Sequence, residues 1–315
     1  MVRASQIIAA IAISMASIAI VPSTALAQTG AASTQSADRK FSPESGALVT
    51  EATDYAAEGN YKKAIKRLKK ARDISSLKPY EIGVIEQMLG NYYYKQNKND
   101  DAIDHFERAL ASGGLLAADQ YKLNKSAAQI MIADGQYNDG ANRLATILSG
   151  ADRSSPKYTK MIMQAYIQGK NYPAALPWAE NWFGQLQNRE RKHYDTMRFL
   201  YQKQGQDANQ LALLETMTQL WPGEKALWNA RMSLLVKLGR KSEVVGVYEA
   251  MYMRGLLTSE AELLKLVDFQ AFYKNYSAAI NLLDREVAAG RIHNSATIAD
   301  KRENIQAHAA LNARP

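Results

Sequence analysis

The sequence predicts an all-α fold, a solenoid of about seven helix-turn-helix units closed by a C-terminal capping helix. In Met88–Leu110, small and aromatic residues recur at helical spacing on both sides of a polar break at Lys95–Asp101, as expected for two amphipathic helices joined by a turn. Related patterns recur along the chain at intervals of roughly 34–38 residues, a period typical of helical-hairpin repeats. One hairpin cannot cover its own apolar face, so stacked neighbours must supply the core.

The first 27 residues predict a cleavable signal peptide. Arg3 provides a positively charged start, Ile7–Val21 is a largely apolar run, and Ala25-Leu26-Ala27 has the small-x-small pattern of a cleavage site. A membrane-spanning helix needs about 20 apolar residues, so an uncleaved anchor is the weaker alternative. We therefore expect export to the periplasm, with no transmembrane span left after cleavage.

Residues 28–44 predict a flexible linker, because small and polar side chains dominate there and little is available to bury. The predicted solenoid covers residues 45–294. A glycine or asparagine should end the first helix of a unit with a positive φ, and Gly90 and Ala102 should let two helices approach closely. The seven predicted units begin near Ser45, Gly83, Tyr121, Pro156, Arg191, Lys225 and Glu260.

Residues 295–315 predict the capping helix and a short tail. Ser295 can cap the start of the helix, and Ile298 and Ile305 share one side of it. The last unit of a solenoid needs such a lid with a polar outer face. A helix that docks onto a partner is the alternative interpretation.

The second unit resembles the tetratricopeptide repeat. Leu89-Gly90-x-x-Tyr93, a turn, and Ala102-x-x-x-Phe106-x-x-Ala109 carry the resemblance, and the unit is repeated in looser form along the chain. The resemblance implies a right-handed superhelix whose first helices line a concave groove that binds protein segments.

Two segments, Val84–Gly90 and Gly255–Gly290, are similar to exported repeat proteins of Gram-negative bacteria that accompany TonB, ExbB and ExbD. This similarity implies a non-enzymatic periplasmic scaffold, an accessory of a TonB-type energy-transduction complex. A cell-envelope coordinator of peptidoglycan synthesis or division machinery is the alternative, and an enzyme with an unrecognised site is a third hypothesis.

A polar stripe on the first helices predicts the partner-binding groove. Lysines recur on it 35 residues apart, which would stack them as a ladder that attracts an acidic segment or a carboxylate terminus. Ordinary solvated lysines are the alternative. Repeats that grip carboxylate termini use Lys and Asn at these offsets, so Gln129 and Gln164 depart from that pattern. The predicted groove residues are Gln87, Asn91, Tyr94, Lys122, Lys125, Gln129, Lys157, Lys160, Gln164 and Lys192.

A second basic feature is Tyr61–Arg72, an amphipathic helix with seven Lys and Arg side chains opposite its packing face. Such a helix either keeps the first unit soluble or serves as an electrostatic handle for anionic lipid or an acidic partner.

Composition argues against catalysis and metal binding. The chain has a net charge of +8 and no cysteine, which excludes disulfides and thiolate sites, and export makes nucleic acid a poor explanation of the charge. The four histidines are far apart in sequence, and we expect them to lie solvated on helix surfaces. We therefore predict no catalytic residue, no cofactor and no metal site.

Overall fold

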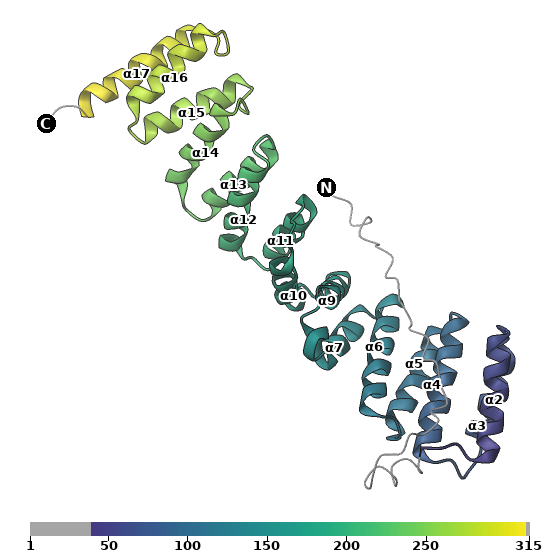
Figure 1. Ribbon diagram of the computed structural model, residues 1–315. Helices are drawn as coiled ribbons and strands as arrows, with labels where there is room; N and C mark the ends of the chain where they lie inside the picture. The colour runs from purple at the N-terminus through teal and green to yellow at the C-terminus, as the bar shows by residue number, and fades with distance from the viewer. Residues whose placement is uncertain (1–38, 313–315) are drawn as a thin grey trace. The chain divides into compact units, whose positions relative to one another are not determined.

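The computed structural model describes residues 39–312, and the regular secondary structure in this range is entirely helical (Figure 1). Residues 1–27 of the predicted signal peptide and residues 28–38 of the predicted linker lie outside the described range. The chain divides into two compact units, one reaching Leu186 and the other beginning at Gln187. Each is a stack of helical hairpins.

The first unit contains four hairpins, in which each helix packs against the next one along the chain. A single short helix, α8, follows the third hairpin and was not predicted. The helices are α2 (Pro43–Ala57), α3 (Tyr61–Arg72), α4 (Pro79–Lys95), α5 (Asn99–Ala111), α6 (Ala117–Ala133), α7 (Tyr137–Ile147), α8 (Gly150–Arg153), α9 (Pro156–Gln168) and α10 (Tyr172–Gln185).

The second unit contains three hairpins and a final helix. The predicted all-α fold of paired helix-turn-helix units is therefore confirmed. Predicted unit starts and helix starts coincide from Pro156 onward, whereas the first three helix pairs begin slightly earlier, at Pro43, Pro79 and Ala117. The helices of the second unit are α11 (Arg191–Lys203), α12 (Asp207–Leu220), α13 (Lys225–Lys237), α14 (Lys241–Met253), α15 (Glu260–Phe272), α16 (Tyr276–Ala288) and α17 (Ala296–Asn312).

Each hairpin turn contains one residue with a positive φ, which lets the chain leave the first helix and reverse. Five turns have the expected glycine or asparagine, and two have lysine, a residue that adopts this conformation only at an energetic cost. The seven residues are Gly59, Asn97, Gly135, Lys170, Gly205, Gly239 and Lys274.

The core of the second hairpin depends on close approach of α4 and α5. Leu89, Ala102 and Phe106 are fully buried. A Cβ atom on Gly90 would lie 2.4 Å from the Phe106 ring and 3.0 Å from the carbonyl oxygen of Ala102. The predicted role of the small residues in this hairpin is thereby confirmed.

The packed part of the chain starts before the end of the predicted linker. Phe41 packs against the first core cluster, and Ser42 caps α2 through a bond from the Ser45 amide. The buried Glu81 of α4 accepts hydrogen bonds from the Ser42 amide (2.8 Å), the Ser45 hydroxyl (2.5 Å) and the Lys78 amide (2.9 Å). Burial alone would raise the pKa of Glu81, but these bonds hold it below its ordinary value. The composition of residues 28–44 did not predict these contacts, because only Phe41, Ser42 and Ser45 make them.

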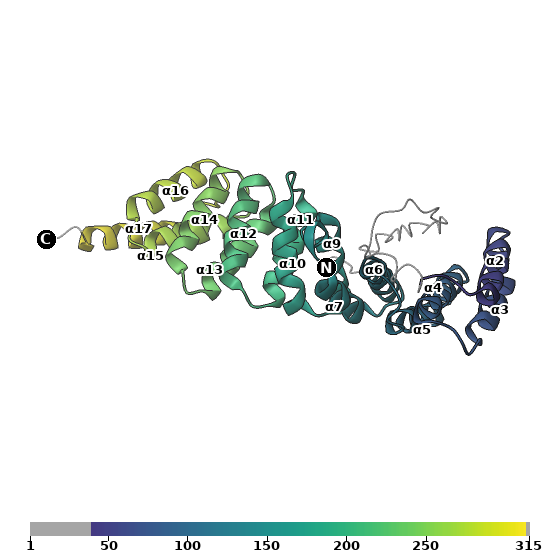
Figure 2. The same cartoon turned by 60° about the horizontal axis from the view of Figure 1, so that its bottom comes forward.

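The final helix covers the last hairpin. Ile298 and Ile305 are buried, and α17 packs along α16 (Figure 2). Two ion pairs join α17 to α15 and α16, Lys301 with Asp268 (2.5 Å) and Arg302 with Asp284 (2.6 Å). Within residues 39–312, no helix has the length and apolar character needed to cross a membrane.

Candidate partner-binding surface

The centre of the predicted groove is a cluster of lysines and tyrosines where α6 meets α8 and α9. The Lys125 Nζ lies 2.6 Å from Oδ2 of Asp152. The same nitrogen lies 4.5 Å from the ring centroid of Tyr121 and 5.4 Å from that of Tyr158. Lys125 is therefore held between two aromatic rings and paired with a carboxylate of the unpredicted helix α8.

The Lys125–Asp152 pair is satisfied inside the protein. Hydrogen bonds from Lys125 and from the Tyr121 hydroxyl (2.8 Å) keep the pKa of Asp152 below its ordinary value. Burial alone would lower the pKa of Lys125, but the bond to Asp152 raises it above its usual range. Both groups are therefore charged at neutral pH. Because Asp152 already neutralises Lys125, this lysine attracts a partner's carboxylate less strongly than an unpaired lysine would.

Three other predicted lysines on α6 and α9, Lys122, Lys157 and Lys160, are exposed. The Lys157 Nζ lies 5.5 Å from the Tyr158 ring, so Lys125 and Lys157 contact the same aromatic side chain. Lys122 is 3.7 Å from Asp119, a loose pair between exposed groups that contributes little. Lys160 makes no ion pair within residues 39–312. We define the α6–α9 face as the exposed side chains of Lys122, Lys157 and Lys160; the Tyr158 ring beside Lys157 is buried.

Five of the remaining predicted residues lie on four different helices. Gln87, Asn91, Gln129 and Gln164 are half-buried on their helices. Lys192 belongs to the second unit, where it pairs with Glu190 (2.7 Å).

Tyr94, predicted as a groove residue, packs partly against two core clusters. The Tyr94 ring extends from α4 to the neighbouring hairpin. Spacing along a helix gives the face on which a side chain lies, but not how far that side chain extends.

The basic helix α3 has the predicted division into a buried and a charged face. Ala64, Ile65, Leu68 and Ala71 are buried. Of the cations, Arg67 pairs with Glu51 (2.8 Å) and Lys69 lies 5.6 Å from the Tyr93 ring. The exposed lysines of α3 are Lys62, Lys63, Lys66, Lys69 and Lys70.

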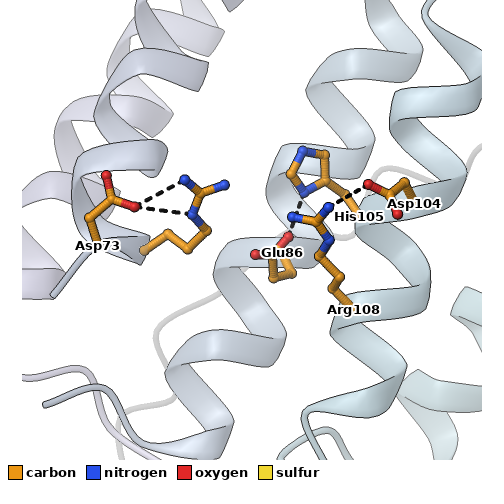
Figure 3. A network of polar contacts seen from close by, with 6 residues as sticks. Asp73, Glu86, Asp104, His105 and Arg108 are labelled. Atoms are coloured by element: carbon orange, nitrogen blue, oxygen red, sulfur yellow. Dashed lines mark hydrogen bonds and ion pairs between the residues drawn. The ribbon is translucent and has the colours of Figure 1, made fainter. Parts of the chain in front are cut away.

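His105 is buried, so the expectation of four solvated histidines is wrong at this position. Its Nδ1 lies 2.5 Å from Oε2 of Glu86, and its ring stacks on Tyr93 with centroids 5.0 Å apart. Figure 3 shows the pair between α4 and α5, with the exposed Arg108–Asp104 pair on the outer side of α5. Helical spacing alone signalled this burial, since His105 lies three residues after Ala102 and four before Ala109, both of which are buried. The pair lies in the core and joins two helices.

Polar side chains elsewhere give no sign of a metal centre. Within residues 39–312, no group of three or more His, Asp or Glu side chains could hold a metal ion. His293 and His308 are exposed, as expected.

Comparison with known families identifies the N-terminal hairpins. Residues 45–112 match the family model of the tetratricopeptide repeat. This segment is similar to tetratricopeptide repeats. It comprises α2 to α5, including the Gly90–Ala102 contact on which the resemblance was based. No curated protein matches the chain.

Among solved structures, a tetratricopeptide repeat protein from Parabacteroides merdae is 14% identical, with 84% of this chain and 100% of that one covered and a TM-score of 0.40. A structure of Naa15/Naa10 bound to HypK-THB is 19% identical, with 79% and 38% covered and a TM-score of 0.46. MamA (AMB-1) is 18% identical, with 57% and 93% covered and a TM-score of 0.40. Likenesses at this level say nothing about partner or activity.

Proposed function

We propose that the chain is a non-enzymatic scaffold that binds an acidic segment of a partner protein on the α6–α9 face. The observation that carries the proposal is the exposure of Lys122, Lys157 and Lys160 on the first helices of two consecutive hairpins. Exposed lysines attract carboxylates at long range, and salt screens this attraction.

Lys125 supports the site without being its main contact. Its ion pair with Asp152 fixes the positions of α6 and α8, and its ammonium lies against Tyr158. Replacing Lys125 would leave Asp152 without its strongest partner, so a loss of binding in such a variant would not distinguish recognition from folding. The test therefore uses Lys157 and Lys160.

The test measures binding of a fluorescent polyglutamate peptide to the full chain by anisotropy, at low and at high ionic strength. We expect the double substitution Lys157→Glu and Lys160→Glu to weaken binding by about tenfold at low salt, with a smaller difference at high salt. Lys66→Glu with Lys70→Glu is the matched control, because it makes the same charge change on the exposed face of α3.

Equal losses in both double variants would overturn the proposal, since net charge alone would then explain binding. A loss confined to the Lys66 and Lys70 variant would assign the binding to α3. Circular dichroism of each variant checks that the helices are intact.

We further propose that the scaffold acts in the periplasm as an accessory of a TonB-type complex. The pattern of residues 1–27 supports export, and the similarity of Val84–Gly90 and Gly255–Gly290 to TonB-associated repeat proteins supports the partner. Mass spectrometry of the protein from fractionated cells tests the first part, with cleavage after Ala27 as the expected result and a full-length cytoplasmic protein as the contrary one.

Cross-linking in intact cells tests the second part. Recovery of TonB, ExbB or ExbD with the wild-type chain is the expected result. Recovery of peptidoglycan-synthesis or division proteins in their place would favour the coordinator role.

A further inference from the structure

An apolar hollow lies on the second unit, where α13, α14 and α15 meet. It has a volume of about 490 Å³. Of its apolar lining residues, Val244 is buried and Phe269 is half-buried. Its outer walls are Val236, which is 51% exposed, and Phe272, which is 77% exposed. Large apolar side chains exposed around a concavity are a feature of surfaces that bind other molecules.

The rim of this hollow is basic. Lys241 and Lys265 line it and are exposed, and neither pairs with a carboxylate within residues 39–312. The Lys265 Nζ lies 5.9 Å from the Phe269 ring, so the cation is held beside the apolar wall. The one acidic lining residue, Asp268, is neutralised by Lys301 at 2.5 Å. The hollow thus offers two available positive charges beside an apolar surface.

The shape of the hollow favours a peptide over an enclosed small molecule. Sites for small ligands bury most of the ligand surface, whereas here the walls Val236 and Phe272 are themselves largely open to solvent. A peptide segment can place one side chain in a shallow hollow and leave the rest of its surface outside.

We propose that this hollow is a docking site for a short acidic, amphipathic segment of a partner protein. The segment places a bulky apolar side chain between Val236 and Phe272 and carboxylates against Lys241 and Lys265. All four side chains belong to the second unit, so the site is separate from the α6–α9 face and does not depend on it.

The experiment selects peptides of about 12 residues from a phage-displayed random library on the full chain, then measures each enriched peptide by fluorescence anisotropy. We expect the enriched peptides to combine aromatic or leucine side chains with Glu or Asp. We expect Phe272→Ser to weaken their binding by about tenfold, as is usual for an aromatic residue central to an interface. Lys241→Glu combined with Lys265→Glu should do the same at low ionic strength.

Two control variants make the result specific. Met253→Ser removes an apolar side chain that is 84% exposed on α14 but does not line the hollow, and should leave binding unchanged. The double substitution Lys157→Glu and Lys160→Glu tests the α6–α9 face, and it should also leave these peptides unaffected. The two proposals can therefore fail independently. Because Phe272 is exposed, its replacement by serine opens no core, and circular dichroism confirms that each variant is folded.

Four outcomes would overturn the proposal. The first is no enrichment of any peptide, and the second is enrichment only of peptides that bind Phe272→Ser and wild type equally. The third is a concentration-dependent dimer in sedimentation experiments that disappears in Phe272→Ser, which would assign the hollow to a second copy of the chain. The fourth is binding of oleate in a Phe272-dependent manner without any acidic peptide being enriched, which would make the hollow a lipid site.

Discussion

Lysine occupies the positive-φ position in two of the seven hairpin turns, Lys170 with φ 57° and Lys274 with φ 63°. A side chain with a Cβ atom costs about 1–2 kcal/mol in this conformation. Glycine avoids that cost but loses more conformational freedom on folding, so part of the gain is offset. Turns of this kind are therefore positions where one substitution can stabilise the native chain.

We predict that Lys170→Gly raises the free energy of unfolding by about 0.5–1 kcal/mol. Urea denaturation followed by circular dichroism measures it as a higher midpoint. Lys160→Gly, the same substitution inside α9 of the same hairpin, is the control and should destabilise by about 1 kcal/mol. Equal destabilisation in both variants would mean that the turn conformation is not the source of strain.

Protonation of Glu262 at low pH should lower the stability of the second unit. The ion pair with Lys225 (2.5 Å) and the amides of Ser259 and Thr258 hold the pKa of Glu262 at about 2. Because the folded pKa lies below the ordinary value of 4.5, the stabilisation is complete above about pH 5 and is lost as the pH falls toward 2.

We predict that Glu262→Gln lowers the free energy of unfolding at pH 7 by something on the order of 2–3 kcal/mol and flattens its dependence on pH between about 5 and 2. Glutamine can still accept from the Ser259 amide, so the helix cap is kept and the loss reports the charge. Denaturation at pH 7 and pH 3 measures both effects. The exposed Glu303→Gln on α17 is the control, and an equally steep pH dependence in Glu262→Gln would contradict the assignment.

At the scale of the element, the spacing between paired helices is set by small residues. Gly90 lies against Phe106 and the backbone of Ala102, so α4 and α5 are closer than they would be with any other residue at this position. Gly246 of α14 presents the opposite case, because a Cβ atom there would meet nothing within 4 Å. Two helical glycines therefore have different reasons to be present, and only one of them is required by packing.

Alanine substitution separates the two cases. We predict that Gly90→Ala destabilises the chain by about 1–3 kcal/mol, because the added methyl group overpacks the contact with Phe106. Gly246→Ala should stabilise by up to about 1 kcal/mol through the higher helix propensity of alanine. Urea midpoints measure both. A neutral Gly90→Ala would show that α5 can move away at no cost.

At the scale of the whole molecule, the local features of the chain could be predicted and the tertiary ones could not. Turn residues such as Gly59 and small residues such as Gly90 act on their immediate neighbours, so their spacing predicted seven hairpins. Lys125 was predicted as a free groove residue, yet it pairs with Asp152 on a four-residue helix that has no periodic signal. The exposed Phe272 was missed as well, because apolar periodicity does not say which apolar side chains the next hairpin leaves uncovered.

The division into two units predicts that stability is local. In stacked repeats each hairpin contacts mainly its neighbours, so total stability is approximately the sum of local terms, and the effect of a substitution should fade with distance along the chain. The fully buried Leu89 of α4 and the almost fully buried Leu266 of α15 report on the two units. Each Leu→Ala substitution should cost about 2–5 kcal/mol where it is made.

Hydrogen exchange read by mass spectrometry tests this locality. We expect Leu89→Ala to lower amide protection in the first unit while the peptides of α13–α16 keep theirs, and Leu266→Ala to do the reverse. Equal loss of protection in both units from either substitution would show that the chain unfolds as one cooperative body. The two units would then unfold together, so a partner bound at the α6–α9 face would also stabilise the hollow of the second unit, and the reverse would hold. Local unfolding instead leaves each surface to be stabilised by its own partner.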